Sequence, residues 1–427
     1  MSRRVAVVGA GAMSCLGTDY RQQWREVLAA RTGLRRRGDF DPPALAYFGN
    51  VKHTDNHLGP GDLKQFKRLT RPSQLGVMTA DLAVADAGAV FHAAAPRRRA
   101  IYIGSNETEE EKAYFDRYSA VLASARRPDG SIDYARLGQQ ALRRARPDFL
   151  LSGLPNAALC QITIRNSICG ANTTLVDSAA IGLCAVGRAF RSIREGRADV
   201  AVCGGTDSSR DQFVQLAFRE LGLASSCVQG AQSFRPYDRN RDGYICAEGA
   251  AVLVLADLKF ARANNAEVIA EVLGFGAATD VGHPLAPDPA GSGVRAAITR
   301  ALADAHLDAA RVGYVYGHGD ATPGGDRSEL CGIADTLARD RRIPLTATKA
   351  GTGHIGPATD VLEVIFGCLS VRDRVIPPTL NLVDPDDSAH NVEIVADEPR
   401  DLNAQYAIAL SRNGNGPEVA ALVVGAM

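Results

Sequence analysis

From residue 312 the chain reads Val-Gly-Tyr-Val-Tyr-Gly-His-Gly-Asp-Ala-Thr-Pro-Gly-Gly-Asp, ending at Asp326. The run Val312–Tyr316 is rich in β-branched and aromatic residues, so it predicts a short strand that is buried on both faces. Glycines surround His318 directly after this strand, and a helical pattern follows at Arg327–Ala338. A strand that passes through a glycine-rich turn into a helix is typical of an α/β fold, and such turns are where functional side chains tend to lie.

The same alternation of strand and helix extends along the chain and predicts an α/β fold. Strands are expected at Val5–Gly9, Ala100–Gly104, Val200–Gly204, Ala250–Leu255, Val312–Tyr316 and Tyr406–Leu410. Helices are expected at Asp19–Ala30, Ser73–Ala87, Cys184–Ile193, Ser292–Ala303, Arg327–Ala338 and Asp360–Leu369. A polar stretch from Asn106 to about Arg146 interrupts the alternation with its own helical pattern, and we interpret it as an excursion from the core. Strand-like segments followed by small-residue turns occur in both halves of the chain, which indicates an internal duplication.

Composition excludes several classes of function. The 427 residues carry 48 basic and 48 acidic side chains, so no global field favours nucleic acid. The nine cysteines are scattered and lack metal-ligand spacing, which argues against a disulfide framework or a zinc site and favours a reducing cytoplasm. No apolar stretch approaches the roughly 18 residues that a membrane helix needs. We therefore expect a cytoplasmic protein that binds neither nucleic acid nor membrane.

Two segments resemble ligand-binding motifs without completing them. Val5–Met13 begins like a dinucleotide-binding turn, but no acidic residue closes a second strand about 20 residues further on. We expect a tight strand-to-loop turn there. Asp238–Gly243 begins like a calcium loop, but Gly249 stands where the bidentate Glu should be. We expect a structural turn that is capped by Asp side chains.

Two further segments complete a pattern that begins with His318. The segment from Lys349 to His354 reads Lys-Ala-Gly-Thr-Gly-His. The segment from Leu175 to Gly187 reads Leu-Val-Asp-Ser-Ala-Ala-Ile-Gly-Leu-Cys-Ala-Val-Gly. Together the three segments resemble the active-site segments of the ketosynthases, the condensing enzymes of fatty-acid and polyketide synthesis. The resemblance covers most of the chain and includes Arg235-Pro-Tyr-Asp-Arg-Asn-Arg-Asp-Gly-Tyr and Glu248-Gly-Ala-Ala-Val-Leu-Val-Leu.

The resemblance implies a thiolase-type fold, in which two duplicated βαβαβ halves form one five-layered α-β-α-β-α unit. We place the N-terminal half at residues 1–257, with the excursion at about 106–150, and the C-terminal half at residues 258–427. The resemblance also implies substrates held as acyl thioesters on the phosphopantetheine arm of an acyl carrier protein. It implies no bound cofactor, no metal and a homodimer.

The nucleophile position departs from the family pattern. In the family a cysteine at a helix N-terminus attacks the incoming thioester, because the helix dipole there favours the thiolate. The matching residue is Ala179, which has no nucleophile, so we expect the chain as written to be inactive or impaired. Either an original cysteine was replaced by engineering, or the protein is a natural member that does not form an acyl-enzyme. Cys184 is no substitute, because it faces another side of the helix.

The other active-site residues of the family are retained. The resemblance implies that His318 and His354 share proton transfer and stabilise an enolate or alkoxide. It implies that Lys349 orients His354 with help from Glu329. Chain-length-factor partners, which lack the cysteine naturally, usually carry Gln there and tend to lose the histidines as well. The complete acid–base set therefore favours an original cysteine at position 179.

A second departure concerns the walls of the pocket. The family's C-terminal turn reads Phe-Gly-Phe-Gly-Gly, whereas this chain has Asn413, Gly414, Asn415, Gly416 and Pro417. The resemblance implies that the backbone N–H groups of positions 179 and 413 form an oxyanion hole. It also implies substrate contacts from Asn415, from Thr322 and from Asp320, which replaces a Thr that contacts the pantetheine arm. The pocket is thus expected to be polar.

We therefore expect a ketosynthase-type acyltransferase of natural-product biosynthesis. An acyl group would pass from a carrier protein to position 179, and a carbon–carbon bond would follow. The asparagine turn favours intramolecular aldol closure and lactone release, as in ketosynthases that resemble γ-lactam-β-lactone bicyclases. One alternative is ordinary decarboxylative Claisen condensation. Another is a partner subunit of the chain-length-factor type, which would form a heterodimer with a true ketosynthase.

Overall fold

The computed structural model describes residues 3–38, 45–52, 69–106, 111–144, 154–176, 180–280, 286–388, 391–414 and 417–427. Its strands are β1 (Val5–Met13), β2 (Arg35–Arg36), β3 (Tyr47–Phe48), β4 (Arg99–Ser105), β5 (Asn172–Leu175), β6 (Val200–Ser208), β7 (Glu248–Asp257), β8 (Ala270–Thr279), β9 (Val312–Tyr316), β10 (Ile343–Thr346), β11 (Val375–Ile376), β12 (Val392–Ile394), β13 (Arg400–Asp401), β14 (Tyr406–Arg412) and β15 (Glu418–Gly425). Its helices are α1 (Tyr20–Leu28), α3 (Arg71–Ala87), α4 (Ala89–Ala93), α5 (Glu111–Ala125), α6 (Tyr134–Arg144), α8 (Ala157–Arg165), α9 (Ile181–Arg194), α10 (Gln212–Glu220), α11 (Leu258–Ala263), α12 (Ser292–Ala305), α13 (Pro323–Leu337), α14 (Lys349–Thr352) and α15 (Pro357–Asp373).

The first half of the chain forms one side of a large mixed sheet. The order there is β5-β4-β6-β7-β1. β4 pairs in parallel with β5 and β6, whereas β7 pairs antiparallel with both β6 and β1. All seven residues of β4 are buried, as expected for a parallel strand that is covered on both faces.

The second half of the chain repeats this strand order. β9 pairs in parallel with β10 and β14, β14 pairs antiparallel with β15, and β15 pairs antiparallel with β8. The order β10-β9-β14-β15-β8 matches that of the first half strand for strand, and β12 extends it beyond β10. β1 and β8 pair antiparallel over Val5–Val7 and join the halves into one sheet of eleven strands among the described residues. The repeat fits the predicted duplication, and the proposed boundary between residues 257 and 258 stays a prediction.

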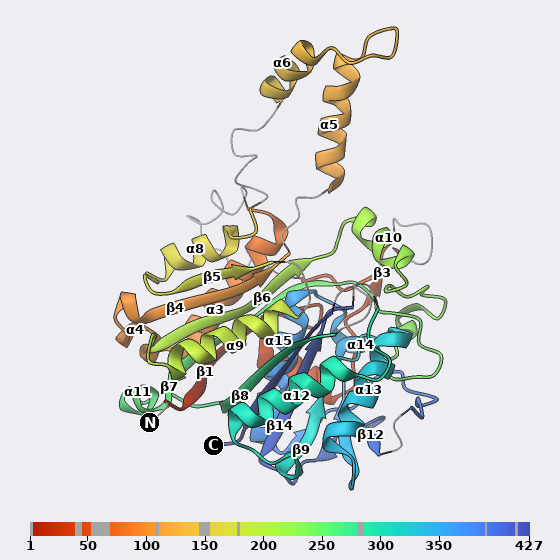
Figure 1. The fold of residues 1–427 in the computed structure, drawn as a ribbon. Coiled ribbons are helices and arrows are strands. Elements are labelled where there is room, and N and C mark those ends of the chain that lie inside the picture. Colours follow the sequence, from red (N-terminus) through yellow and green to blue (C-terminus); the bar gives the residue numbers. More distant parts are fainter. Residues whose placement is uncertain are drawn as a thin grey trace.

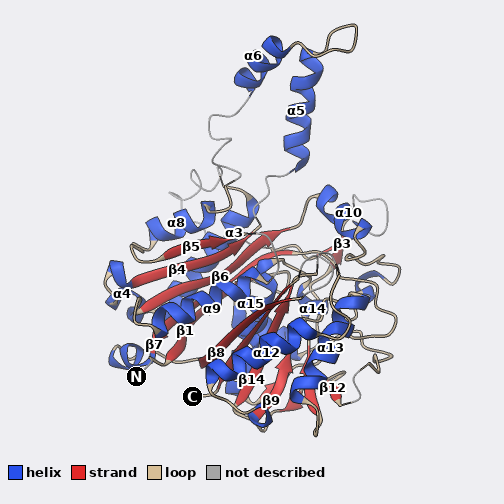
Figure 2. Cartoon of the chain, in the orientation of Figure 1, coloured by secondary structure: helices blue, strands red, loops and turns tan. Residues whose placement is uncertain are grey.

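Helices cover both faces of each half of the sheet (Figure 1). In β1, Val5 and Val7 pack in the cluster that contains α9 and α15, whereas Ala6 and Val8 pack against α3. In the second half, β14 and β15 share another cluster with α12 and α13. The layers therefore run from α3 through the first half of the sheet to α9 and α15, and then through the second half to α12 (Figure 2). This is the layered arrangement that the resemblance implies.

The two central helices meet at their N-terminal ends. Every residue of α15 from Pro357 to Val371 is buried, which fits its place between the two halves of the sheet. A Cβ atom on Gly182, in the first turn of α9, would lie only 1.8 Å from the carbonyl oxygen of Pro357. The start of α9 thus lies against the start of α15, directly after the segment that contains His354.

The predicted turn after Gly9 is wrong. β1 continues through Gly9 and Gly11 to Met13, and a Cβ atom on Gly11 would lie 2.4 Å from the carbonyl oxygen of Thr79 in α3. The equivalent strand β8 shows the same feature, because a Cβ atom on Gly276 would lie 2.2 Å from the carbonyl oxygen of Ala297 in α12. These glycines let a helix pack closely on a strand, which explains the glycine pattern without a nucleotide.

Within the predicted excursion, α5 and α6 project from the layered body (Figure 1), and the bounds of the excursion stay a prediction. The segment that resembles a calcium loop is a capped turn, as predicted. Asp238 accepts the N–H of Asn240 at 2.8 Å, and Asp242 accepts the N–H of Ser226 at 2.9 Å. Within the described part of the chain, no helix is both long enough and apolar enough to cross a membrane.

Candidate active site

His318 lies in the loop that follows β9. The carboxylate of Glu329, in α13, accepts the backbone N–H of His318 at 2.5 Å and that of Gly319 at 2.9 Å. Gly319 has φ +50°, and a Cβ atom on it would lie 2.4 Å from the Cβ of Ala347, so the turn requires glycine. The hydroxyl of Tyr237 donates at 2.9 Å to Oε2 of Glu329, the oxygen that also accepts the N–H of Gly319. Glu329 therefore fixes the loop of His318, in contrast to its predicted role beside Lys349 and His354.

The side chain of His318 faces carboxylates at both ring nitrogens. Nδ1 lies 2.9 Å from Oδ1 of Asp360, and Nε2 lies 3.7 Å from Oδ2 of Asp320. Burial and the nearby Lys349 lower the pKa of His318, but Asp360 and Asp320 outweigh them and raise it to about 9. The two carboxylates therefore favour the imidazolium form of His318.

His354 is held in a different state. Its backbone N–H donates to Ile245 and its carbonyl accepts from Ala247, both at 2.9 Å, while its ring stacks on Tyr244 with centroids 4.2 Å apart. Nδ1 accepts the N–H of Gly356 at 3.3 Å, so the proton of the neutral ring lies on Nε2. Burial, together with the charges of His318 and Lys349, lowers the pKa of His354 to about 3.

The two imidazoles face the same space. Their ring centroids are 6.0 Å apart with an interplanar angle of 80°, and Nε2 of each ring has no hydrogen-bond partner among the described residues. Both nitrogens therefore carry protons that are available to a substrate oxygen. Preorganised donors of this kind stabilise the negative charge that develops on an enolate or alkoxide.

Lys349 contacts other partners than those predicted. Its ammonium donates to the carbonyl oxygen of His318 and to Glu363, and it lies 3.0 Å from Asp360. Lys349 thus positions the His318 loop, and the prediction that it orients His354 is corrected. Burial would lower the pKa of Lys349, but the two carboxylates of α15 raise it above its usual value.

The sequence did not single out Asp360 and Glu363 as site residues. Both lie in the buried helix α15. There Asp360 contacts the ring of His318 and the ammonium of Lys349, and it accepts a hydrogen bond from the hydroxyl of Ser411. Burial opposes ionisation of Asp360, but Lys349 and His318 hold its pKa below the usual range. Burial and Asp360 raise the pKa of Glu363 to about 7 against the opposing effect of Lys349. The available signal was two carboxylates three residues apart within an otherwise apolar helical segment.

Asp320 lies beside His318 and contacts Thr322, while the substrate contacts predicted for both residues stay predictions. Oδ1 of Asp320 accepts the N–H of Thr322 at 2.9 Å and its hydroxyl at 2.7 Å. Burial would raise the pKa of Asp320, but the nearby His318 and the hydrogen bonds from Thr322 hold it below the usual range. A Cβ atom on Gly414 would lie 3.2 Å from Oδ2 of Asp320, so Gly414 borders this carboxylate.

The oxyanion donor predicted at Asn413 is corrected. Its backbone N–H donates to the carbonyl oxygen of Glu418 at 2.9 Å, and its side-chain Nδ2 donates to the carboxylate of Glu418 at 3.1 Å. Both groups are therefore used within the β14–β15 turn. Ala179 and Asn415 lie outside the described residues; the described chain resumes at Ala180, the N-cap of α9.

Comparison with known proteins identifies the family. Residues 2–261 match the family model "Beta-ketoacyl synthase, N-terminal domain", and residues 269–383 match "Beta-ketoacyl synthase, C-terminal domain". The chain belongs to the beta-ketoacyl synthase family. Over 424 residues it is 30% identical to a 3-oxoacyl-[acyl-carrier-protein] synthase 2 of Staphylococcus aureus (strain COL), covering 97% of this chain and 96% of the relative. Family membership makes this ketosynthase a condensing, acyl-transferring enzyme in type.

Solved ketosynthase structures share the fold. A type II PKS acyl-carrier protein in complex with its ketosynthase matches with a TM-score of 0.87 at 21% identity, covering 100% of both chains. The ishigamide ketosynthase/chain length factor matches with a TM-score of 0.84 at 26% identity, again over 100% of both chains. The predicted thiolase-type α/β fold is thereby confirmed.

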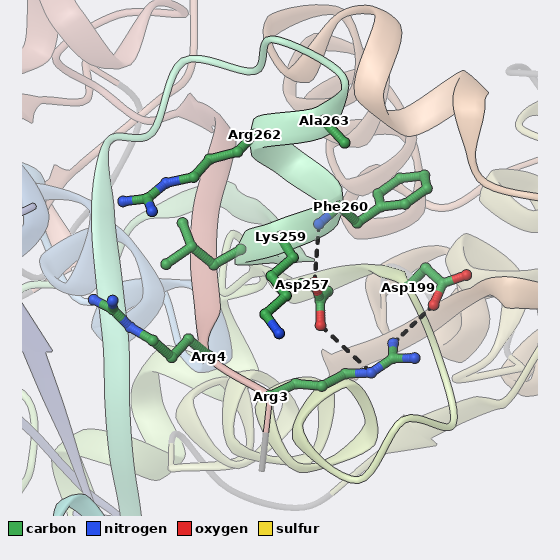
Figure 3. A pocket seen from close by; sticks show the side chains of 9 residues that line it. Arg3, Arg4, Asp199, Asp257, Lys259, Phe260, Arg262 and Ala263 are labelled. Carbon is green, nitrogen blue, oxygen red and sulfur yellow. Dashed lines mark hydrogen bonds and ion pairs between the residues drawn. The ribbon is translucent and has the colours of Figure 1, made fainter. Parts of the chain in front are cut away.

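A cavity of about 550 Å³ lies elsewhere on the ketosynthase, where β1 begins and β7 ends (Figure 3). It is lined by Arg3, Arg4, Asp199, Asp257, Leu258, Lys259, Phe260, Arg262 and Ala263. Arg3 bridges Asp199 at 2.8 Å and Asp257 at 3.4 Å, so these charges hold the N-terminus against α11. None of the candidate active-site residues lines this cavity. The described residues also contain no group of three or more His, Cys, Asp or Glu side chains that could hold a metal ion.

Proposed function

We propose that this ketosynthase takes an acyl group from the phosphopantetheine arm of an acyl carrier protein and then forms a carbon–carbon bond. The observation that carries the proposal is the pair of imidazoles, His318 and His354, whose Nε2 atoms face one space from a buried charge network. The name of the Staphylococcus aureus relative supports a carrier-bound substrate. Acyl transfer requires a cysteine at position 179, so with Ala179 the chain does not form an acyl-enzyme.

The bond-forming step that the site favours is an intramolecular aldol closure, with lactone release by the new alkoxide. Asp320 is buried next to His318 and bears a negative charge. A malonyl carboxylate brought near Asp320 would meet a like charge, and at about 4 Å this repulsion is on the order of 4 kcal/mol near a protein surface. An acyl chain that closes on itself brings no such charge. The imidazolium and the neutral imidazole would then hold the alkoxide oxygen.

The experiment that tests the proposal uses the Ala179→Cys variant with an acylated carrier protein. Intact-protein mass spectrometry is expected to show the acyl group on the enzyme, followed by product without malonyl-carrier protein. Strict dependence on malonyl-carrier protein with release of CO₂ would replace closure by decarboxylative elongation. The unmodified chain is the control and is expected to stay unacylated, because Ala179 has no thiol.

A second candidate function rests on Ala179 itself. A subunit without the nucleophile would serve as a partner that shapes the pocket of a cysteine-bearing ketosynthase. The structural likeness to the ishigamide ketosynthase/chain length factor supports this candidate. Purification of the chain from its source as a stable complex with a cysteine-bearing homologue would favour it over the enzyme.

We also expect the ketosynthase to be a homodimer. β5 is the last strand at one end of the sheet, and it pairs only with β4 among the described residues. An exposed strand edge favours pairing with a second chain. Analytical ultracentrifugation at micromolar concentration should give twice the chain mass of 45.2 kDa. We expect the dimer interface to exceed about 2,000 Å², as in obligate dimers. A monomer would contradict the prediction.

A further inference from the structure

One oxygen of the Asp320 carboxylate takes no part in the hydrogen bonds that hold the fold together. Asp320 is fully buried, and its Oδ1 is satisfied twice by Thr322. Its Oδ2 has no hydrogen-bond partner among the described residues. Nε2 of His318 lies 3.7 Å from this oxygen and also lacks a hydrogen-bond partner among the described residues. Two buried polar atoms without partners, placed opposite each other, need an explanation in terms of function.

The geometry determines where the protons of His318 lie. Asp360 accepts from Lys349 and Ser411, so it is an ionised acceptor, and Nδ1 of His318 must donate to it at 2.9 Å. If Nε2 had a lone pair, it would face the carboxylate of Asp320, and two acceptors would oppose each other. With a proton on Nε2, the same arrangement becomes an attraction between an imidazolium and a carboxylate.

We propose that Asp320 keeps His318 in its imidazolium form, and thereby makes His318 the proton donor of the site while His354 acts as a neutral hydrogen-bond donor. Asp320 is in this sense a positioning residue, because it acts on the reaction through His318. The inference rests on the proposed function for its role in turnover, although the protonation state itself can be measured without turnover.

The proton transfers balance over closure and release. In closure, the C–H bond of the nucleophilic carbon breaks and its proton passes to water, while the new alkoxide accepts a hydrogen bond from Nε2 of His318. The alkoxide then attacks the thioester carbon, the C–S bond breaks, and the Nε2 proton of His318 passes to the departing thiolate. The imidazolium loses one positive charge and the sulfur loses one negative charge. The lone pair left on Nε2 then faces the carboxylate of Asp320, which favours the return of a proton from water before the next turnover. Asp320 thus resets His318 after each transfer.

Besides Asp320, several ionisable groups lie near His318, its loop or the partners of that loop. They are Asp326 and Glu329 of α13, Lys349 of α14, His354, and Asp360 and Glu363 of α15. Lys349 and burial oppose the imidazolium, whereas Asp360 and Asp320 favour it, and together they raise the pKa of His318 to about 9. Without the charge of Asp320, only the carboxylate of Asp360 would raise the pKa of His318, while burial and Lys349 would lower it.

The test is a titration of the eight histidines by NMR, with a ¹³Cε1 label on the chain as it exists. The signal of His318 is assigned by its loss in His318→Gln. In the parent it is expected to titrate near pH 9. In Asp320→Asn the midpoint should fall by more than one pH unit, toward the ordinary histidine value of about 6.5 or below it. Asparagine preserves the acceptor for Thr322 and presents an N–H₂ group to Nε2.

Asp340→Asn, at an exposed position, is the matched control and should leave the midpoint of His318 unchanged. Asp320→Thr provides a second charge-free variant if the asparagine variant does not fold. A His318 midpoint within about 0.3 pH units of the parent in the folded variant would overturn the inference. In the Ala179→Cys background, the high-pH limb of the bond-forming rate should move down by the same amount as the midpoint. A shifted NMR midpoint without any turnover would sustain the protonation assignment and refute the proposed function.

Discussion

In a variant with cysteine at position 179, the further change His354→Ala is expected to leave acylation intact and to stop the step that follows. Acylation depends on the thiolate, whereas bond formation depends on a positioned donor worth about 10²–10⁴-fold in rate. Nε2 of His354 has no hydrogen-bond partner among the described residues, so its proton is free for substrate. Intact-protein mass spectrometry should show an acyl-enzyme that accumulates without product.

The backbone of His354 makes this a clean substitution. Its N–H and carbonyl pair with Ile245 and Ala247, and alanine preserves both hydrogen bonds. His92→Ala, at an exposed histidine of α4, is the matched control and should keep full turnover. Product formation by the His354→Ala enzyme at the parent rate would show that His318 alone serves the step.

Replacing Lys349 by methionine is expected to lower the free energy of unfolding by about 3–5 kcal/mol, since it leaves buried carboxylates without their cation. Lys349 is fully buried, and its ammonium contacts both Asp360 and Glu363. Methionine has a similar length, so the loss reflects charge more than volume. Denaturant titration followed by circular dichroism measures the change.

Two further variants separate charge from packing. Lys259→Met removes an exposed lysine and should change stability little, as surface substitutions usually do. Adding Glu363→Gln to Lys349→Met removes one of the unpaired carboxylates and should recover part of the lost stability. If Lys349→Met is no less stable than Lys259→Met, the buried ion pairs do not hold this site together.

Local sequence patterns predicted several core strands, but they failed where a residue is required by packing against another element. Val312–Tyr316 is a strand with the predicted bounds, because its apolar run is continuous. β8 was not predicted, since Gly274 and Gly276 interrupt its apolar pattern. Those glycines pack against Ala301 and Ala297 of α12, which lies beyond the few adjacent residues that a strand pattern compares. A local pattern does not contain this information.

The same reason explains the outcome at the site. Motif spacing identified His318, His354 and Lys349 as candidate site residues, and the structure places them together. The partner of Lys349 at Glu363 depends on how α15 is threaded between the halves of the sheet, which the spacing does not encode. The backbone donor expected at Asn413 failed because the register of β14 against β15 brings it to the carbonyl of Glu418.

The repeated strand order has a consequence for how such a protein changes over generations. In the first half α9 follows β5 and the nucleophile position, and in the second half α15 follows β10 and His354. The two halves thus place different positions of the site at equivalent points of the repeat. A variant that lost one of the two halves would lose the reaction. A single substitution where the starts of α9 and α15 meet, such as at Gly182, would instead alter how the two halves pack against each other.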